Sequence, residues 1–230
     1  MTNGEFASRV VNDLNALNKD AHISRRWILS IGRTKVESYV AQRWDDGSLW
    51  GDFSLLTRVN CVKMIEVNKI ECCDAAFELC GTLMRSEKKL PGLHFGSLGP
   101  IVVEVSNIDN TMFFSYATLK SYAKRKKRKY ADKGKKYYYI NDGYLYIPDV
   151  HIELVNILFF TVKKREAMRL SSCEEKEKDC LSEWEYEFVV PKKLIEYIVS
   201  ETVKEASMKV QITTDENPNL DLNQKTQTVQ

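Results

Sequence analysis

The sequence predicts an α+β protein in which a helical body is interrupted by a β-rich insertion and followed by an extended C-terminal tail. Three observations support this class. Apolar residues recur at helical spacing near both ends of the 230-residue chain, strand-like runs with a hairpin signal lie between them, and the residues from Thr213 onward are polar and aperiodic. We expect the body to comprise residues 1–90 and 191–212, the insertion 91–190 and the tail 213–230.

Three helices are predicted for the body. A short amphipathic helix over 5–17 is followed by a break and then by a longer helix over 21–44, and Pro191 suits the first position of the last helix. Each helix must bury one apolar stripe, so we expect the three to pack together. The stripes are Phe6, Val10, Leu14 and Leu17; Ile23, Trp27, Ile28, Ile31, Tyr39, Val40 and Trp44; and Leu194, Ile195, Ile198, Val199, Val203 and Ala206.

The insertion has the composition of strands. Asp142 and Gly143 separate two tyrosine-rich runs, and this dipeptide is a strong hairpin signal because both residues tolerate positive φ. The segment 54–86 mixes both signals: 54–67 is rich in β-branched residues, whereas 75–83 is more helical, so its structure stays open. Strands are predicted at 101–105, 111–114, 137–140, 144–147, 155–162 and 184–190.

Positive charge is concentrated in the segment 120–136, KSYAKRKKRKYADKGKK. This segment holds ten of the 34 bases and one of the 32 acids, so the rest of the chain has 24 bases against 31 acids and a net charge of −7, although the whole chain is at +2. Such a segment suits a polyanion or an acidic protein neighbour at one defined place.

Three interpretations of this basic segment remain open. It contacts nucleic-acid phosphates without base specificity, with Tyr122 and Tyr130 available for stacking; it docks on an acidic partner subunit; or it is a solvated loop between two strands. The candidate contact residues are Lys120, Lys124, Arg125, Lys126, Lys127, Arg128, Lys129, Lys133, Lys135 and Lys136.

Motifs for enzyme chemistry are missing from the sequence. It has no P-loop, nucleophile elbow, zinc-protease motif or dinucleotide fingerprint, and His22, His94 and His151 are widely separated. We therefore expect no enzyme activity, no cofactor and no metal. A signal peptide and a membrane span are not expected either. Free thiols are expected for the six cysteines, since none forms a CxxC pair; a bridge between Cys173 and Cys180 is not required.

An ordered set of short segments resembles one protein family. The segments are LNKDAHISRRWILSIGRTKVESYVAQ, KKLPGL, IDN, KRKKRKYADK, YYYINDGYLYIPD, SEWEYEFVVPKKLIEYIVSETVKEA and DENPNLD, from Leu17 to Asp221. Together they resemble virion structural proteins of crAss-like podoviruses, and more narrowly the ring or adaptor proteins of the head-to-tail connector beneath the portal.

The resemblance implies a structural role. Proteins of this kind combine a helical body with a β-rich insertion, form twelvefold rings and extend C-terminal arms onto the portal or a neighbouring subunit. Portal protein, further copies of the chain, other tail rings and non-specific DNA are thus the expected partners, at the portal vertex of the virion after assembly in the host cytoplasm. The expected arm contacts are Pro218, Leu220 and Leu222. The alternative is a stand-alone nucleic-acid-binding module that uses 120–136.

Overall fold

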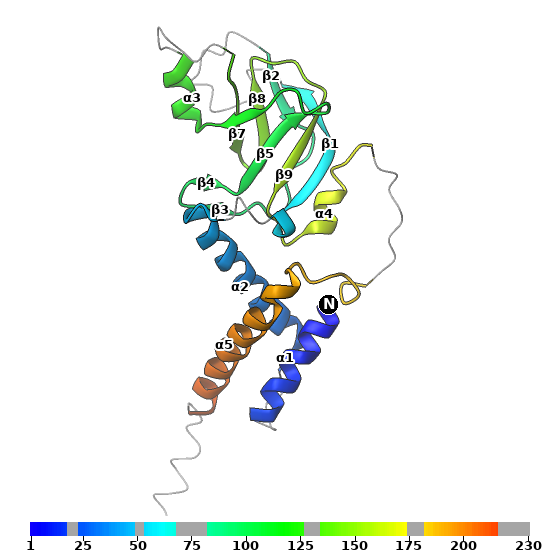
Figure 1. Cartoon of the computed structure of the whole chain (residues 1–230), viewed down its shortest axis with the longest axis vertical. Helices are drawn as coiled ribbons and strands as arrows, with labels where there is room; N and C mark the ends of the chain where they lie inside the picture. Colours follow the sequence, from blue (N-terminus) through cyan, green and yellow to red (C-terminus); the bar gives the residue numbers. More distant parts are fainter. Residues whose placement is uncertain (18–22, 49–52, 68–81, 127–133, 174–181, 216–230) are drawn as a thin grey trace, which may run out of the picture. The chain divides into compact units, whose positions relative to one another are not determined.

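The computed structural model describes residues 1–17, 23–48, 53–67, 82–126, 134–173 and 182–215, and it confirms the predicted α+β class. The chain forms two compact units. The helical unit comprises Met1–Tyr39 and Asp179–Gln230, and the β-rich unit comprises Val40–Lys178. The predicted boundary after residue 90 thus falls inside the β-rich unit, because the structure forms strands well before that point (Figure 1).

Three helices pack together in the helical unit, as the sequence predicts. They are α1 (Asn3–Leu17), the first part of α2 (Arg25–Asp45) and α5 (Ile195–Asp215), the last preceded by the short 3₁₀ helix η3 (Lys192–Leu194) (Figure 1). Helix α5 therefore continues past residue 213, where the tail was predicted to begin, and Pro191 lies just outside η3. The buried side chains include Phe6, Val10, Leu14, Ile28, Leu29, Ile31, Val36, Ile198, Val199, Thr202 and Ala206.

The start of α1 is capped by a reciprocal pair of hydrogen bonds. The Glu5 amide donates to Thr2 Oγ1 at 3.1 Å, and the Thr2 amide donates to Glu5 Oε2 at 2.8 Å. This is a capping box, in which two residues satisfy main-chain donors that a helix N-terminus leaves open. It explains why α1 begins at Asn3, slightly before the apolar periodicity starts.

The strand predicted at 184–190 is wrong. This segment lies along the beginning of α1: the amides of Asn3 and Gly4 donate to the carbonyls of Tyr186 and Trp184 at 2.7 and 2.9 Å. Its pairing with Thr2 is a single isolated bridge. The ring of Phe188 in this segment packs against Phe6 of α1 instead of a neighbouring strand.

Seven strands form the main sheet of the β-rich unit. Their order is β5-β9-β1-β2-β8-β7-β6, antiparallel except for the parallel pair β6–β7. A small hairpin, β3 (Phe95–Gly96) with β4 (Gly99–Pro100), and the helices α3 (Leu119–Lys126) and α4 (Lys164–Met168) complete the unit. The strands are β1 (Thr57–Glu66), β2 (Leu83–Ser86), β5 (Val102–Asn107), β6 (Phe114–Tyr116), β7 (Lys136–Asn141), β8 (Tyr144–Pro148) and β9 (Leu154–Phe159).

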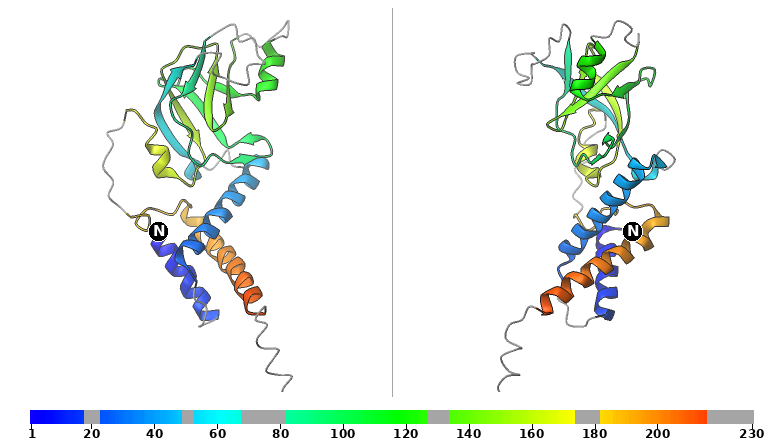
Figure 2. Two further views of the ribbon diagram at one scale, coloured as in Figure 1. Left: turned by 180° about the vertical axis from the view of Figure 1, so that it is seen from behind. Right: turned by 90° about the vertical axis from the view of Figure 1, so that its left-hand side faces the viewer.

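The sheet curls on itself (Figure 2). Its outer strands β5 and β6 stand at opposite ends of the order, yet Ser106 of β5 and Phe113, the residue before β6, form an isolated bridge. The curled sheet encloses one apolar core, which removes inward-facing side chains from water. The core includes Val59, Val62, Met64, Met84, Val102, Val105, Phe114, Tyr138, Leu145, Ile147, Val155, Ile157 and Phe159.

The predicted hairpin is confirmed. Strands β7 and β8 pair in antiparallel register around Asp142 and Gly143, whose φ angles are 48° and 78°. Positive φ at both central residues is the geometry of the tightest hairpin turns. The open segment 54–86 contributes β1 and β2, so the helical signal at Leu83 did not correspond to a helix; residues 68–81 lie outside the described residues.

Candidate functional site

The first part of the basic segment is a helix, not the loop that one interpretation proposed. Thr118 starts α3: its Oγ1 accepts from the Ser121 amide at 3.2 Å, and its carbonyl accepts from the Tyr122 amide at 2.8 Å. Of the predicted contact residues, Lys120, Lys124, Arg125 and Lys126 belong to α3, and Lys135 and Lys136 lie at the start of β7. Lys127, Arg128, Lys129 and Lys133 lie outside the described residues.

Tyr122 holds α3 against the sheet. Its ring is 7% exposed, its hydroxyl donates to the Asp149 carboxylate, and it meets the Tyr137 ring edge-on at 6.3 Å. Burial, followed by this hydrogen bond, raises the pKa of Tyr122, so the hydroxyl stays protonated and continues to donate. The prediction that Tyr122 is available to stack on bases is therefore wrong, and Tyr130 lies outside the described residues.

Tyrosines cover the outer surface of strands β2, β8 and β7. Register pairs Tyr139 with Tyr146, and their rings stack at 5.0 Å between centroids and 4° between planes. Leu83 joins this outer cluster from β2, and Leu119 packs on it from α3. Because side chains alternate along a strand, Tyr138 points the other way, into the core.

Two cations outside the basic segment lie on the same surface. The Arg85 guanidinium lies 4.7 Å from the centroid of the Tyr144 ring, and Lys89 Nζ lies 5.3 Å from it. Lys89 also pairs with Asp142 at 2.9 Å, a hydrogen bond that raises the pKa of the lysine. At the other end of the cluster the Arg125 guanidinium lies 5.2 Å from the Tyr137 ring. No pattern in the sequence indicates Arg85 and Lys89 as members of this surface, since their approach to Tyr144 depends on the pairing of β2 with β8.

We call this surface the basic-tyrosine face. Its cations outnumber its acids, Asp142 and Asp149, among the described residues, so its potential is positive. Its members are Arg85, Lys89, Lys120, Lys124, Arg125 and Lys135, with the partly exposed Tyr137 and Tyr144 and the buried Tyr139 and Tyr146. Lys136 is not a member, because it pairs in register with the core residue Phe114 and so belongs to the other side of the sheet.

A family of phage tail proteins matches nearly the whole chain. The family is described as phage tail ring protein 2, and its model matches residues 5–225. The chain belongs to this crAss-like phage tail ring family. The resemblance seen in the sequence is thereby confirmed at the level of the family. No curated protein matches the chain in sequence.

Family membership makes this a structural ring protein of the phage tail, with a place in the virion and association with itself and with other tail or portal proteins. A structural family favours a non-enzymatic role. Among the described residues, no group of three or more His, Cys, Asp or Glu side chains is arranged to hold a metal ion. None of the helices in that part of the chain is long and apolar enough to cross a membrane.

The arm predicted to contact a portal or a neighbour lies outside the described residues. This applies to Pro218, Leu220 and Leu222, because the described part of the ring protein ends with α5 at Asp215. The candidate arm residues therefore stay a prediction.

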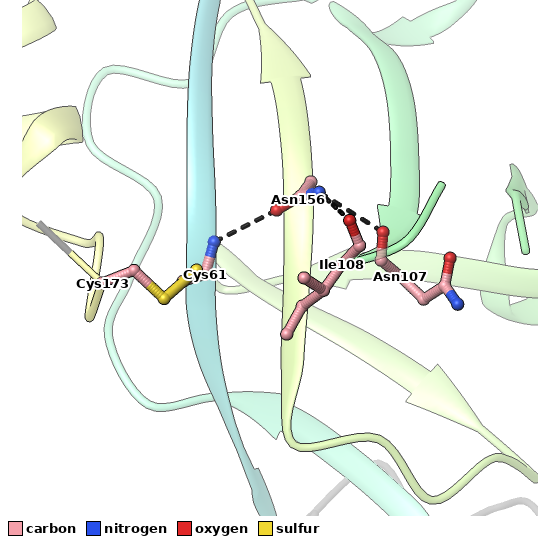
Figure 3. The surroundings of a disulfide bond; sticks show 5 residues. All are labelled: Cys61, Asn107, Ile108, Asn156 and Cys173. Carbon is pink, nitrogen blue, oxygen red and sulfur yellow. Dashed lines mark hydrogen bonds between the residues drawn. A yellow bond between two sulfur atoms is a disulfide. The ribbon is translucent and has the colours of Figure 1, made fainter. Parts of the chain in front are cut away.

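A disulfide corrects the expectation of free thiols. Cys61 in β1 and Cys173 are bonded, with their Cα atoms 5.7 Å apart (Figure 3). Cys61 has a φ of 55° at an irregularity in the pairing of β1 with β9. This bulge presents its side chain to Cys173, and the Ser172 amide donates to the Cys61 carbonyl at 3.1 Å. Cys72, Cys73, Cys80 and Cys180 lie outside the described residues.

The buried carboxamide of Asn156 joins this bulge to the turn after β5. Its Oδ1 accepts from the Cys61 amide at 3.2 Å, and its Nδ2 donates to the carbonyls of Asn107 and Ile108 at 3.3 and 3.1 Å (Figure 3). Asn107 in turn holds the loop that follows, since its own side chain accepts from the amides of Thr111 and Met112. Because residues up to 113 belong to this loop, β6 begins at Phe114 and not at residue 111, where the strand was predicted to start.

We expect Asn156→Leu to lower the free energy of unfolding by about 2–4 kcal/mol, because it leaves a buried amide and two carbonyls without partners at similar side-chain volume. Urea denaturation followed by tryptophan fluorescence measures the change. The exposed Ser115→Ala in β6 serves as the control and should change stability by less than about 0.5 kcal/mol. Equal stability of both variants would show that the Asn156 bonds contribute nothing net.

Proposed function

We propose that this ring protein forms the adaptor ring of the head-to-tail connector, docking on the portal, extending the DNA channel and joining capsid to tail. Twelve copies would close the ring, after synthesis and assembly in the host cytoplasm. The observation that carries the proposal is the family match over residues 5–225, since a tail ring must bind both its own copies and the rings above or below.

The distribution of charge between the two units supports ring closure. A ring needs a heterologous interface, in which one patch of a subunit meets a different patch of the next. The helical unit has 11 bases and 14 acids, and the β-rich unit has 23 bases and 18 acids. Opposite net charges of −3 and +5 favour contact between unlike units of neighbouring copies.

The chain beyond α5 is the segment we assign to portal docking. Its sequence ENPNLDL places a proline and isolated leucines in a polar context, and such a segment can lie extended along a partner and insert the leucines as anchors. Pro218, Leu220 and Leu222 are the residues proposed to make this contact.

Truncation after Asp215 tests the docking role. We expect the full chain to co-purify as a fixed multiple with the portal protein of the same virus, and the truncated chain to lose this association at least about tenfold. Multi-angle light scattering of the chain alone and of the mixture gives the stoichiometry. Leu220→Ala combined with Leu222→Ala is the milder variant, and Val229→Ala in the same segment is its matched control. Full portal association of the truncated chain would refute the assignment of the arm.

A stand-alone nucleic-acid-binding module is the second candidate, and the basic-tyrosine face is the observation that favours it. This candidate predicts salt-sensitive binding to DNA or RNA by the isolated chain together with no association with the portal. The portal mixture therefore separates the two candidates.

A further inference from the structure

Arg85 is a half-buried cation without an anionic partner in the described part of the chain. Its Nε is buried and makes no hydrogen bond, and none of the ion pairs among the described residues includes it. The contact with the Tyr144 ring stabilises the guanidinium but leaves its hydrogen-bonding capacity open. A cation held in this way at a surface indicates an anion that binds from outside the chain.

The other cations extend this site across the face. Arg85 pairs in register with Tyr146, which pairs with Tyr139, so the site crosses from β2 to β7. Two strand spacings of about 4.8 Å separate these strands, and a helix about 10 Å wide follows. The cations from Arg85 on β2 to those on α3 therefore span roughly 20 Å. This length matches several successive phosphates of a nucleic-acid strand, which are spaced at about 3.4 Å along the axis.

Three cations on α3 likewise make no ion pair with any described residue. They are Lys120, Lys124 and Arg125, and all three are exposed. Helix α3 is itself fixed by the buried Tyr122, so its charges are held at a set position above the sheet. Preorganised charges lose less entropy on binding than charges on a free loop.

The composition of the face favours a phosphate backbone over a protein partner. Stable protein interfaces have an apolar or aromatic centre that becomes fully buried. The large, strongly exposed apolar side chains of the β-rich unit lie elsewhere: Phe95, Leu98, Ile108, Phe113 and Met168 belong to other strands, turns and helices. The tyrosines of the face are stacked on each other or covered by cations, so they support the charges and do not form an apolar anchor.

We propose that the basic-tyrosine face binds the phosphate backbone of DNA without base specificity, and that Arg85 of β2 and Lys89 of the loop after β2 act there together with Lys120, Lys124 and Arg125 of α3. Each cation neutralises a phosphate and releases condensed counterions, so binding is strong at low salt and weak at high salt. The inference deepens the proposed function by naming the face that would contact DNA, and it holds equally if the chain acts without a portal.

Fluorescence anisotropy with a short labelled duplex tests the inference on the full chain. We expect binding that weakens steeply between about 50 and 200 mM salt, and Arg85→Gln with Lys89→Gln should reduce the slope of log K against log salt by about 2 and the affinity by at least tenfold. Lys120→Gln with Lys124→Gln, at exposed positions that make no ion pair with a described residue, should act in the same direction.

The matched control is Lys164→Gln with Arg169→Gln, which removes the same charge from the region of α4 in the same unit. An equal loss of affinity in this control would show that only net charge matters, and this would overturn the proposal. Absence of DNA binding, or loss of self-association in the Arg85 and Lys89 variant with DNA binding unchanged, would overturn it as well, the latter in favour of an acidic protein partner. Portal association, measured separately, reports on the proposed function and not on this face.

Discussion

Removal of the Cys61–Cys173 disulfide is expected to destabilise the β-rich unit by about 4–5 kcal/mol. The two cysteines are 112 residues apart, and a crosslink that closes a loop of this length removes much conformational freedom from the unfolded chain. Cys173→Ser is the preferred variant, because Cys173 is exposed and its replacement leaves no cavity. Urea denaturation without reductant should show the loss directly.

Reduction provides the internal control for this result. Dithiothreitol should lower the stability of the unmodified chain to that of Cys173→Ser and leave the variant itself unchanged. Mass spectrometry of a proteolytic digest should contain a linked pair of peptides that carries Cys61 and Cys173. Identical unfolding curves with and without reductant, combined with free Cys61 in the digest, would refute the bond.

The sequence predicts those elements that depend on local patterns. The apolar periodicity over 5–17 gives α1, and the stripe with Ile28, Ile31 and Val40 gives α2. The Asp142-Gly143 turn gives β7 and β8 in the correct positions, because positive φ at both residues is a property of the dipeptide itself. In each of these cases the information lies within a few turns of helix or a few residues of strand.

The disulfide and the basic-tyrosine face could not be predicted in the same way. The bond joins two cysteines whose approach requires the pairing of β1 with β9 and a bulge at Cys61. Likewise, Arg85 reaches Tyr144 only because β2 lies beside β8. These contacts are made between segments far apart in the chain, and a single sequence contains no periodicity that reports them.

The sequence shows where the basic residues are concentrated but does not show that the first part of the segment is helical. Its charge density is visible in the composition, whereas its helical start depends on the Thr118 cap and on burial of Tyr122 against the sheet. Burial of Tyr122 also shows why an aromatic residue within a charged run is not by itself a base-stacking residue. Such an aromatic residue can instead be buried by packing against neighbouring strands.

Substitution of Phe188 is expected to cause the second large loss of stability. Phe188 lies in the segment 184–190, where the sequence predicted a strand that the structure does not form. Phe188 stacks on Phe6 of α1 with ring centroids 4.0 Å apart, and its backbone amide donates to the Met1 carbonyl at 3.0 Å. The sequence 184–190 suggests a strand, yet an irregular segment buries Phe188 when a helix provides the apolar surface. Burial of the ring, and not strand pairing, should therefore hold the segment in place.

We expect Phe188→Ala to lower the free energy of unfolding of the helical unit by about 3–5 kcal/mol, since it removes a ring that is 7% exposed from contact with the fully buried Phe6. Phe188→Leu keeps most of the apolar volume and should cost less than about 1.5 kcal/mol. The control is Met208→Ala on α5, where the side chain is 51% exposed and the loss should be within about 0.5 kcal/mol. Thermal unfolding followed by circular dichroism at the helical band measures all three. If the alanine and leucine variants at 188 prove equally unstable, the ring stack is not what holds the segment, and the main-chain bonds to Met1, Asn3 and Gly4 must do so instead.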